Sequence, residues 1–308
     1  MFKTVITGLA LSLSFVLSQS AMASSACQKE RVELQVLGSG GPELDDGRAS
    51  TSYLVWLDGK ARAVVDLGPG SSVNFGQSGA KLEDVSVVML THLHVDHSAD
   101  LPAFVKGAFF TARQRNLTIL GPEGNDLMPS VDQFVSRLFG EEGVFSYLSN
   151  YVVPEQDSAF KLKTKSVGLG LKEVTYYPIG KEIILSAIPV HHGPIAAVAW
   201  RVDMAGCAIT FSGDMNNNYQ TLEKLALNSD ILVMHNAVPE TAKGVAAHLH
   251  MTPSQIGQIA QKAMVKQLVV SHRMKRTIGH EKETEQQIKK TYSGPILFAN
   301  DLDRFKPF

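Results

Sequence analysis

The alternation of hydrophobic and polar positions predicts a chain of many short strands and a few helices. Apolar or alternating runs predict strands at 31–38, 52–57, 61–68, 85–90, 117–121, 165–179, 182–190, 196–203, 207–214, 231–237 and 266–272. Helical spacing predicts helices over 100–114, within 125–150 and over 252–265, the last opened by Thr252 and Pro253. Strands in two groups, each followed by helices and with no separating linker, predict a layered α/β sandwich.

A dense cluster of histidines follows the predicted strand at 85–90. The stretch THLHVDHS at 91–98 places three of the ten histidines and one aspartate within six residues. Chance would produce this pattern in roughly 1 in 1,000 chains of this length, which disfavours an ordinary solvated loop. Open α/β folds place their sites at the ends of buried strands, so the stretch is a candidate metal cradle.

Other candidate ligands also close apolar runs. His191 and His192 follow the strand at 182–190, Asp214 ends the strand at 207–214, and His272 ends the strand at 266–272. Singly, each residue is typical of a structural or solvated side chain. Together with the first cluster they supply the imidazoles and carboxylates that two zinc ions need.

Composition and charge narrow the function classes. The 308 residues are 44% hydrophobic and 19% charged, which suffices for one large domain or two small ones. The formal net charge is −1, and no extended basic stripe is present. A balanced charge gives no electrostatic reason to expect a nucleic acid as partner.

The N-terminus has the pattern of a secretory leader. Lys3 precedes a short apolar core, and an Ala-x-Ala cleavage site ends at Ala23. We therefore expect a signal peptide over 1–23, a mature domain over 24–308, no membrane anchor, and a periplasmic or secreted protein. Cys27 and Cys207 are the two cysteines. They form either one disulfide, or a buried strand cysteine and a free terminal thiol, and the sequence leaves both interpretations open.

Nine motifs in order resemble one known family. LGSGGP, VVDLG, THLHVDH, DLPAF, GPEG, HHGPIAAVAWRV, FSGD, HLHMT and VVSH together resemble the metallo-β-lactamase superfamily, in its ribonuclease Z and arylsulfatase-like branch. The resemblance implies an αββα four-layer sandwich with a dinuclear zinc site, manganese or iron being the alternative metals. Its implied ligands are His92, His94 and His192 for one ion, Asp96, His97 and His272 for the other, and Asp214 as a bridge.

The same resemblance assigns the candidate catalytic residues. His192 is preferred to His191 because the family's histidine directly precedes glycine, as His192 does here. Asp96 and His250 are the expected catalytic residues, with His250 in HMT as proton donor to the leaving group. The neighbouring His248 leaves the register of that motif open.

The expected activity is that of an exported, dinuclear zinc hydrolase of small phosphodiesters or aryl sulfates. A lactonase or other carboxylic-ester hydrolase, and a non-catalytic metal-binding scaffold, are the alternatives. Ribonuclease Z carries a tRNA-gripping arm between the third histidine motif and the bridging aspartate. Here His192 and Asp214 are only 22 positions apart (214 minus 192), too few for an arm. We therefore expect a small-molecule ester substrate and no nucleic acid, with a homodimer left open. Asn236 also stands where relatives often place Glu.

Overall fold

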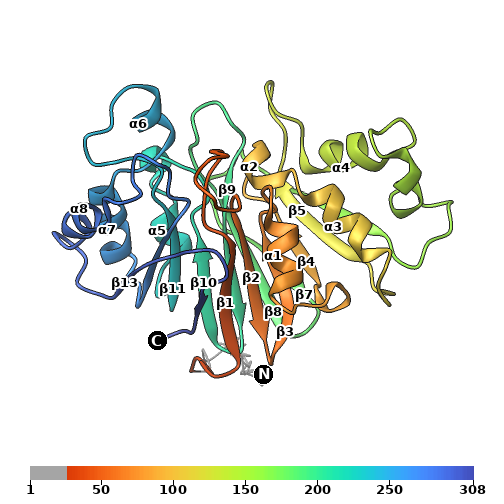
Figure 1. The fold of residues 1–308 in the computed structure, drawn as a ribbon, viewed down its shortest axis with the longest axis horizontal. Coiled ribbons are helices and arrows are strands. Elements are labelled where there is room, and N and C mark those ends of the chain that lie inside the picture. The colour runs from red at the N-terminus through yellow and green to blue at the C-terminus, as the bar shows by residue number, and fades with distance from the viewer. Residues whose placement is uncertain (1–25) are drawn as a thin grey trace, which may run out of the picture.

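The computed structural model describes residues 26–308 and contains two seven-stranded sheets packed face to face, with helices on both outer sides (Figure 1). The predicted signal peptide lies outside the described residues. The layered α/β sandwich expected from the apolar pattern is confirmed.

The first sheet has the strand order β14-β1-β2-β3-β4-β5-β6. Its strands run antiparallel from β14 to β3 and parallel from β3 to β6. They are β1 (Val32–Gly38), β2 (Ser52–Leu57), β3 (Lys60–Val65), β4 (Val87–Met89), β5 (Leu117–Pro122), β6 (Leu162–Val167) and β14 (Arg304–Phe305). The helical segments that follow these strands are α1 (Ser71–Gln77), η1 (Leu82–Asp84), α2 (Val95–Ser98), α3 (Leu101–Ala108), α4 (Val131–Phe139) and η2 (Ser146–Tyr151).

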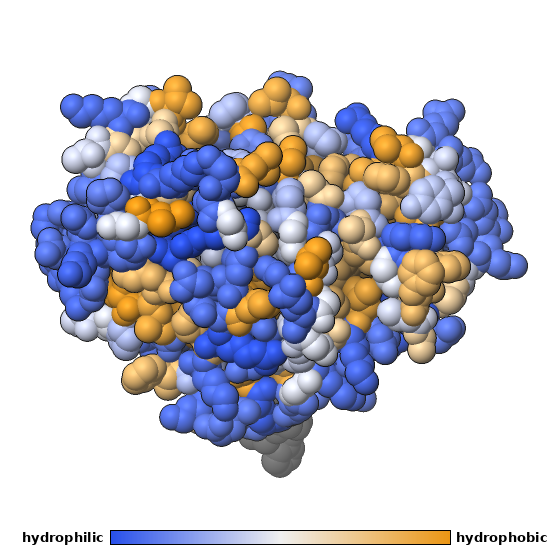
Figure 2. All heavy atoms as spheres, viewed as in Figure 1, coloured by the Kyte–Doolittle hydropathy of each residue, from blue (hydrophilic) through white to orange (hydrophobic). Residues whose placement is uncertain are grey.

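The second sheet has the order β13-β12-β11-β10-β9-β8-β7, and its strands run parallel from β10 to β13. They are β7 (Thr175–Ile179), β8 (Ile183–Pro189), β9 (Val198–Met204), β10 (Cys207–Phe211), β11 (Ile231–His235), β12 (Leu268–Ser271) and β13 (Ile296–Phe298). The associated helices are η3 (Asn217–Tyr219), α5 (Leu222–Leu225), α6 (Val245–Leu249), α7 (Pro253–Lys262) and α8 (Glu281–Ile288). The outer surface at α8 is hydrophilic (Figure 2).

The inner faces of both sheets form one apolar core. Tyr53 of β2 packs against Phe211 of β10, their ring centroids 5.4 Å apart, and the fully buried Trp200 of β9 donates a hydrogen bond to the carbonyl of Leu90. Burying alternate strand residues between the sheets is the main source of stability in such a sandwich. The parallel strands of both sheets end at the same edge, where α2 and α6 lie (Figure 1).

Several elements differ from the sequence prediction. The helix expected over 100–114 ends at Ala108, and only 131–139 of the segment 125–150 is α-helical. In α4, Ser130 and Gln133 form a capping box that fixes its start. Short elements such as α1, α5 and β14 have too few residues to reveal a period.

Two further observations concern the described chain. Cys27 and Cys207 are bonded as a disulfide, which closes one of the alternatives that the sequence left open. Within residues 26–308, no helix has both the length and the apolar character needed to cross a bilayer.

Candidate metal centre

Histidine and aspartate side chains from both sheets meet at the shared edge. The segment after β4 supplies four of them, and the ends of β8, β10, β11 and β12 supply one each. Three overlapping groups have ligand atoms within 4.8 Å of one another: His92, His94 and His192; His97, Asp214, His235 and His272; and His192, Asp214 and His250. The predicted ligands therefore lie together, and their role in binding metal stays a prediction.

Asp214 lies between these groups. Its Oδ2 is 3.7 Å from Nε2 of His97, 3.8 Å from Nε2 of His192 and 3.8 Å from Nδ1 of His250. Its Oδ1 is 3.3 Å from Nε2 of His272. Burial raises the pKa of this carboxyl, but the surrounding imidazoles outweigh burial and hold the pKa well below its usual range. Asp214 is thus a carboxylate, in the position that a bridging ligand would need.

Asp96 lies on the same side of the centre. Its Oδ2 is 3.3 Å from Nε2 of His272 and 3.5 Å from Nε2 of His97. Burial opposes ionisation, but the charge of His97 and the hydrogen bond with His272 leave the pKa of Asp96 below its ordinary value. Asp96 therefore joins His97 and His272, as the sequence assigned it.

His97 is oriented by a buried aspartate that the sequence analysis did not assign. Its Nδ1 lies 2.8 Å from Oδ2 of Asp66, and the Thr91 amide and hydroxyl donate to the same carboxylate at 2.7 and 2.8 Å. Burial lowers the pKa of His97, but Asp96, Asp66 and Asp214 raise it well above its ordinary value. A carboxylate on one ring nitrogen directs the other toward the centre, as in many metal sites.

His235, the last residue of β11, was also missed. Its Nδ1 is 2.8 Å from Oδ1 of Asp214, and its Nε2 is 3.0 Å from the hydroxyl of Tyr53. Burial lowers the pKa of His235 to about 3, despite the hydrogen bond with Asp214. His235 closes an apolar run as the assigned ligands do, so the sequence contains a signal for it directly before Asn236. The Asn236 amide donates to the carbonyl of Val238 instead.

A close backbone approach brings the two sheets' loops together. Gly213 has a φ of 60°, and a Cβ built on it would lie 2.8 Å from Cβ of Thr91. Only glycine fits this left-handed conformation and this contact without strain. The FSGD turn is thereby pressed against the start of the THLHVDH loop, which places Asp214 beside the first histidine cluster.

The structure separates the two adjacent histidines, 191 and 192. His192 is buried, with Nδ1 2.9 Å from the carbonyl of Leu249 and Nε2 3.4 Å from Nδ1 of His94. His191 points away from the centre, with Nδ1 2.9 Å from Oδ1 of Asn216 and its ring edge against Tyr219. The geometry therefore favours His192 as the ligand.

His250 and His248 are separated in the same way. His250 directly follows α6 and reaches Asp214, whereas His248 is exposed and contributes its backbone carbonyl to the side chain of Asn216. Burial lowers the pKa of His250 to about 4, with further lowering by nearby positive groups that include His272 and Arg276. His250 is thus a neutral imidazole at neutral pH when the centre holds only protein atoms.

The donor set fits divalent metal ions. Nε2 of His92 and Nε2 of His97 are buried without a hydrogen-bond partner, which is costly unless another ligand completes them. Neutral imidazoles combined with carboxylates are typical ligands of zinc and of iron or manganese.

Comparison with known proteins places this arrangement in a family. A family model described as the beta-lactamase superfamily domain matches residues 62–273. The match includes all eight candidate site residues from His92 to His272, and it leaves β1, β2, α8, β13 and β14 outside. The chain belongs to the metallo-β-lactamase superfamily. The resemblance inferred from its motifs is confirmed, and the protein is a metallo-β-lactamase-fold hydrolase.

Curated relatives in the superfamily carry the name Ribonuclease Z. That of Listeria welshimeri is 26% identical over 277 residues, covering 78% of this chain and 88% of the relative. That of Mycobacterium bovis is 25% identical and covers 89% of this chain and 97% of the relative.

Solved structures of the superfamily share the fold. The short form of human tRNase Z superimposes with a TM-score of 0.68 at 18% identity, over 90% of this chain and 99% of that protein. Zinc-bound PqqB of Methylobacterium extorquens gives 0.63 at 14% identity, over 89% and 99%. At these identities the likeness establishes the fold alone.

One expectation from the sequence is wrong. We expected a small-molecule ester substrate and no nucleic-acid partner. This conflicts with the relatives named Ribonuclease Z, because this chain matches most of their length. The physical reason is that net charge and a missing arm concern only how a nucleic acid is held. Neither describes the centre that would attack a phosphodiester.

Proposed function

We propose that this superfamily member is a metal-dependent phosphodiesterase that hydrolyses RNA phosphodiester bonds. The observation that carries the proposal is the position of Asp214 within 4 Å of imidazoles from both histidine clusters. The relatives named Ribonuclease Z support the choice of RNA as substrate class. No observation favours aryl sulfates or lactones over phosphodiesters.

We further propose that two ions, most simply zinc, are held by the assigned ligands with Asp214 between them. When bound, such ions supply positive charge that acidifies a water molecule and offsets the charge developing on the phosphate. Asp66 orients His97, and His235 orients Asp214, so both side chains would be held in one geometry when the ions bind. Nδ1 of His250 lies 3.8 Å from Oδ2 of Asp214, and the imidazole would pass a proton to the departing oxygen.

An anionic substrate is part of this role for His250. Its pKa of about 4 is too low for a proton donor at neutral pH. A phosphate anion bound beside the imidazole favours its charged form and raises that pKa toward the working range. The donor would therefore form when substrate binds.

The test is hydrolysis of matched substrates by protein of measured metal content. A 5′-labelled RNA, bis(4-nitrophenyl) phosphate, 4-nitrophenyl sulfate and a lactone cover the ester classes. The proposal expects cleavage of the RNA and of the phosphodiester, and loss of both after metal chelation and in Asp214→Ala. Cleavage of the sulfate or the lactone alone would overturn it.

Export remains a separate proposal. The leader pattern at 1–23 supports it, and so does the Cys27–Cys207 bond, because disulfides persist in oxidising compartments outside the cytoplasm.

A further inference from the structure

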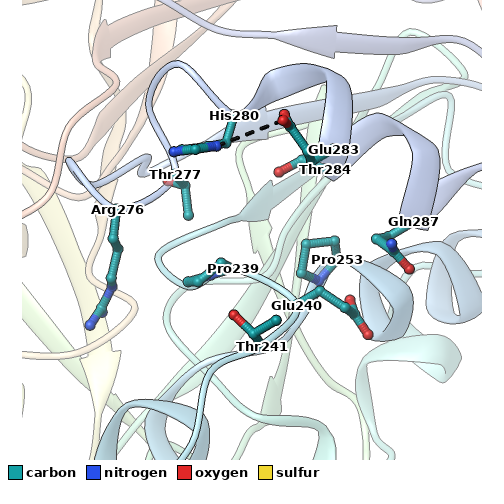
Figure 3. Close-up of a pocket in the computed structure, with 10 residues that line it drawn as sticks. All are labelled: Pro239, Glu240, Thr241, Pro253, Arg276, Thr277, His280, Glu283, Thr284 and Gln287. Carbon is teal, nitrogen blue, oxygen red and sulfur yellow. Dashed lines mark ion pairs between the residues drawn. The ribbon is translucent and has the colours of Figure 1, made fainter.

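A cavity of about 460 Å³ is lined in part by loop and helix residues that follow His235, His250 and His272 by three or four positions. It opens between the loop after β11, the start of α7 and the exposed side of α8 (Figure 3). Its volume is in the range of pockets that hold a small molecule or one unit of a larger ligand. None of the residues assigned to the metal centre lines it.

The cavity is joined to the metal centre by short connections. Pro253 lines the cavity three positions after His250. Thr277 and Thr284 also line it, and their hydroxyls donate to the backbone and side-chain oxygens of Asn236 at 2.9 and 3.4 Å. Asn236 directly follows His235, so the strand that positions Asp214 also fixes the floor of the cavity.

Arg276 lines the cavity from the loop that follows His272. Its Nε donates a hydrogen bond to the carbonyl of Ala237, the second residue after His235. A ligand in the cavity would therefore lie against loops that follow two residues of the candidate metal centre.

The chemistry of the walls is selective. Pro253, Thr277 and Thr284 are buried, Pro239 is half-buried, and the two threonine hydroxyls are already engaged, so the floor is mainly apolar. At the rim of the cavity, Oε1 of the exposed Glu283 lies 3.9 Å from Nδ1 of His280, and the carboxylate is accessible to a ligand. The carboxylate of Glu240, by contrast, is used by the amide and hydroxyl of Ser254.

We infer that this cavity binds a nucleobase of the nucleotide next to the scissile phosphate. A nucleobase has a flat apolar face for the proline-lined floor and N–H groups at its edge for a carboxylate acceptor. The inference rests on the proposed hydrolysis of RNA and names the part of the enzyme that would recognise it.

The first test fills the cavity from its rim. Thr241 lines the cavity and is exposed, so Thr241→Trp would block it without disturbing the core, and Lys243→Trp on the same loop is the matched control. For a dinucleoside monophosphate we expect Thr241→Trp to raise KM about tenfold or more, the scale of one lost stacking contact. Bis(4-nitrophenyl) phosphate, which lacks a base, should be cleaved as by the wild type. Equal effects on both substrates, or on both variants, overturn the inference.

A second test probes the rim carboxylate and does not depend on catalysis. Glu283→Gln removes the negative charge and replaces one of the two acceptor oxygens by an NH2 donor, whereas Glu285→Gln alters a neighbouring surface pair with Lys289. Calorimetry of the metal-loaded protein with adenosine monophosphate should give weaker binding in Glu283→Gln and Thr241→Trp only, and inorganic phosphate should bind all variants alike. If this pattern appears in a protein that cleaves no phosphodiester, the proposed function fails and the base site stands. If RNA is cleaved but every variant binds the nucleotide equally, the base site fails alone.

Discussion

His235 and Asp214 form a buried hydrogen bond of 2.8 Å at the centre of the site. The other ring nitrogen of His235 contacts Tyr53, which is buried between the two sheets. The orientation of the candidate bridging carboxylate is therefore set from the apolar core, through one imidazole, and does not depend on the surface loops.

Removing His235 should loosen the centre without removing an assigned ligand. His235→Asn is expected to weaken zinc binding about 10- to 100-fold, the usual effect of losing a group that orients a ligand. Competition with a chromogenic chelator measures this. Tyr53→Phe keeps the His235–Asp214 contact and should have a smaller effect. Unchanged affinity in His235→Asn would mean that Asp214 is held by the ions alone.

Asp214→Ala should deprive both ions of a ligand. Because the carboxylate lies near imidazoles of both clusters, we expect the variant to retain much less of either ion after dialysis. Metal analysis by mass spectrometry checks this against the wild type. If one ion stays at full occupancy, Asp214 serves a single ion and is no bridge.

His250→Ala separates proton transfer from metal binding. The variant should keep its metal content and cleave esters with poor leaving groups about 100-fold more slowly, the scale of general acid catalysis. Nitrophenolate needs no proton, so its esters should be cleaved almost normally. Steady-state rates on paired aryl and alkyl phosphodiesters measure the difference. Equal slowing of both, or loss of zinc, would make His250 a positioning residue or a ligand.

The metal-free protein should lose stability in acid through His235. Its folded pKa is about 3, below its ordinary 6.5, so between these values the unfolded chain binds a proton that the folded chain does not. The stability that the neutral His235 contributes is then fully present above pH 6.5. It declines as pH falls toward 3, by up to about 1.4 kcal/mol per pH unit. Urea unfolding at several pH values should show that the free energy of unfolding changes less steeply with pH in His235→Asn than in the wild type. If the free energy of unfolding has the same pH dependence in both proteins, His235 is not the group that causes the loss of stability in acid.

The exported form should begin near Ser24 and contain the Cys27–Cys207 bond. Intact-mass spectrometry of periplasmic or secreted protein, before and after reduction, tests both statements. The mass should match cleavage after Ala23 and rise by about two hydrogen masses on reduction, since a disulfide lacks both thiol protons. A mature protein that starts at Met1 would rule out the leader.

The sequence predicted the site residues where a metal-ligating residue type stands directly after an apolar strand. The assigned ligands lie in the segments directly after apolar strands, and parallel strands of a sandwich end at one edge, so their convergence followed from the pattern. Asp66 orients His97 from the neighbouring strand, a relation that no spacing along the chain encodes. His235 closes an apolar run as the assigned ligands do, but nothing in that run shows that its partner is Asp214 on the neighbouring strand. The prediction that no nucleic acid binds was wrong for another reason. The overall charge of the chain says little about which phosphate a buried centre can attack.

The ligand set is divided between the two halves of the chain. His92 to His97 follow β4 of the first sheet, whereas His192, Asp214 and His272 follow strands of the second. A chain interrupted before His272 therefore cannot assemble the complete set, however well its first sheet folds. Full occupancy of the metal sites would thus report that the whole chain has been made, because it requires that both sheets have formed and packed together.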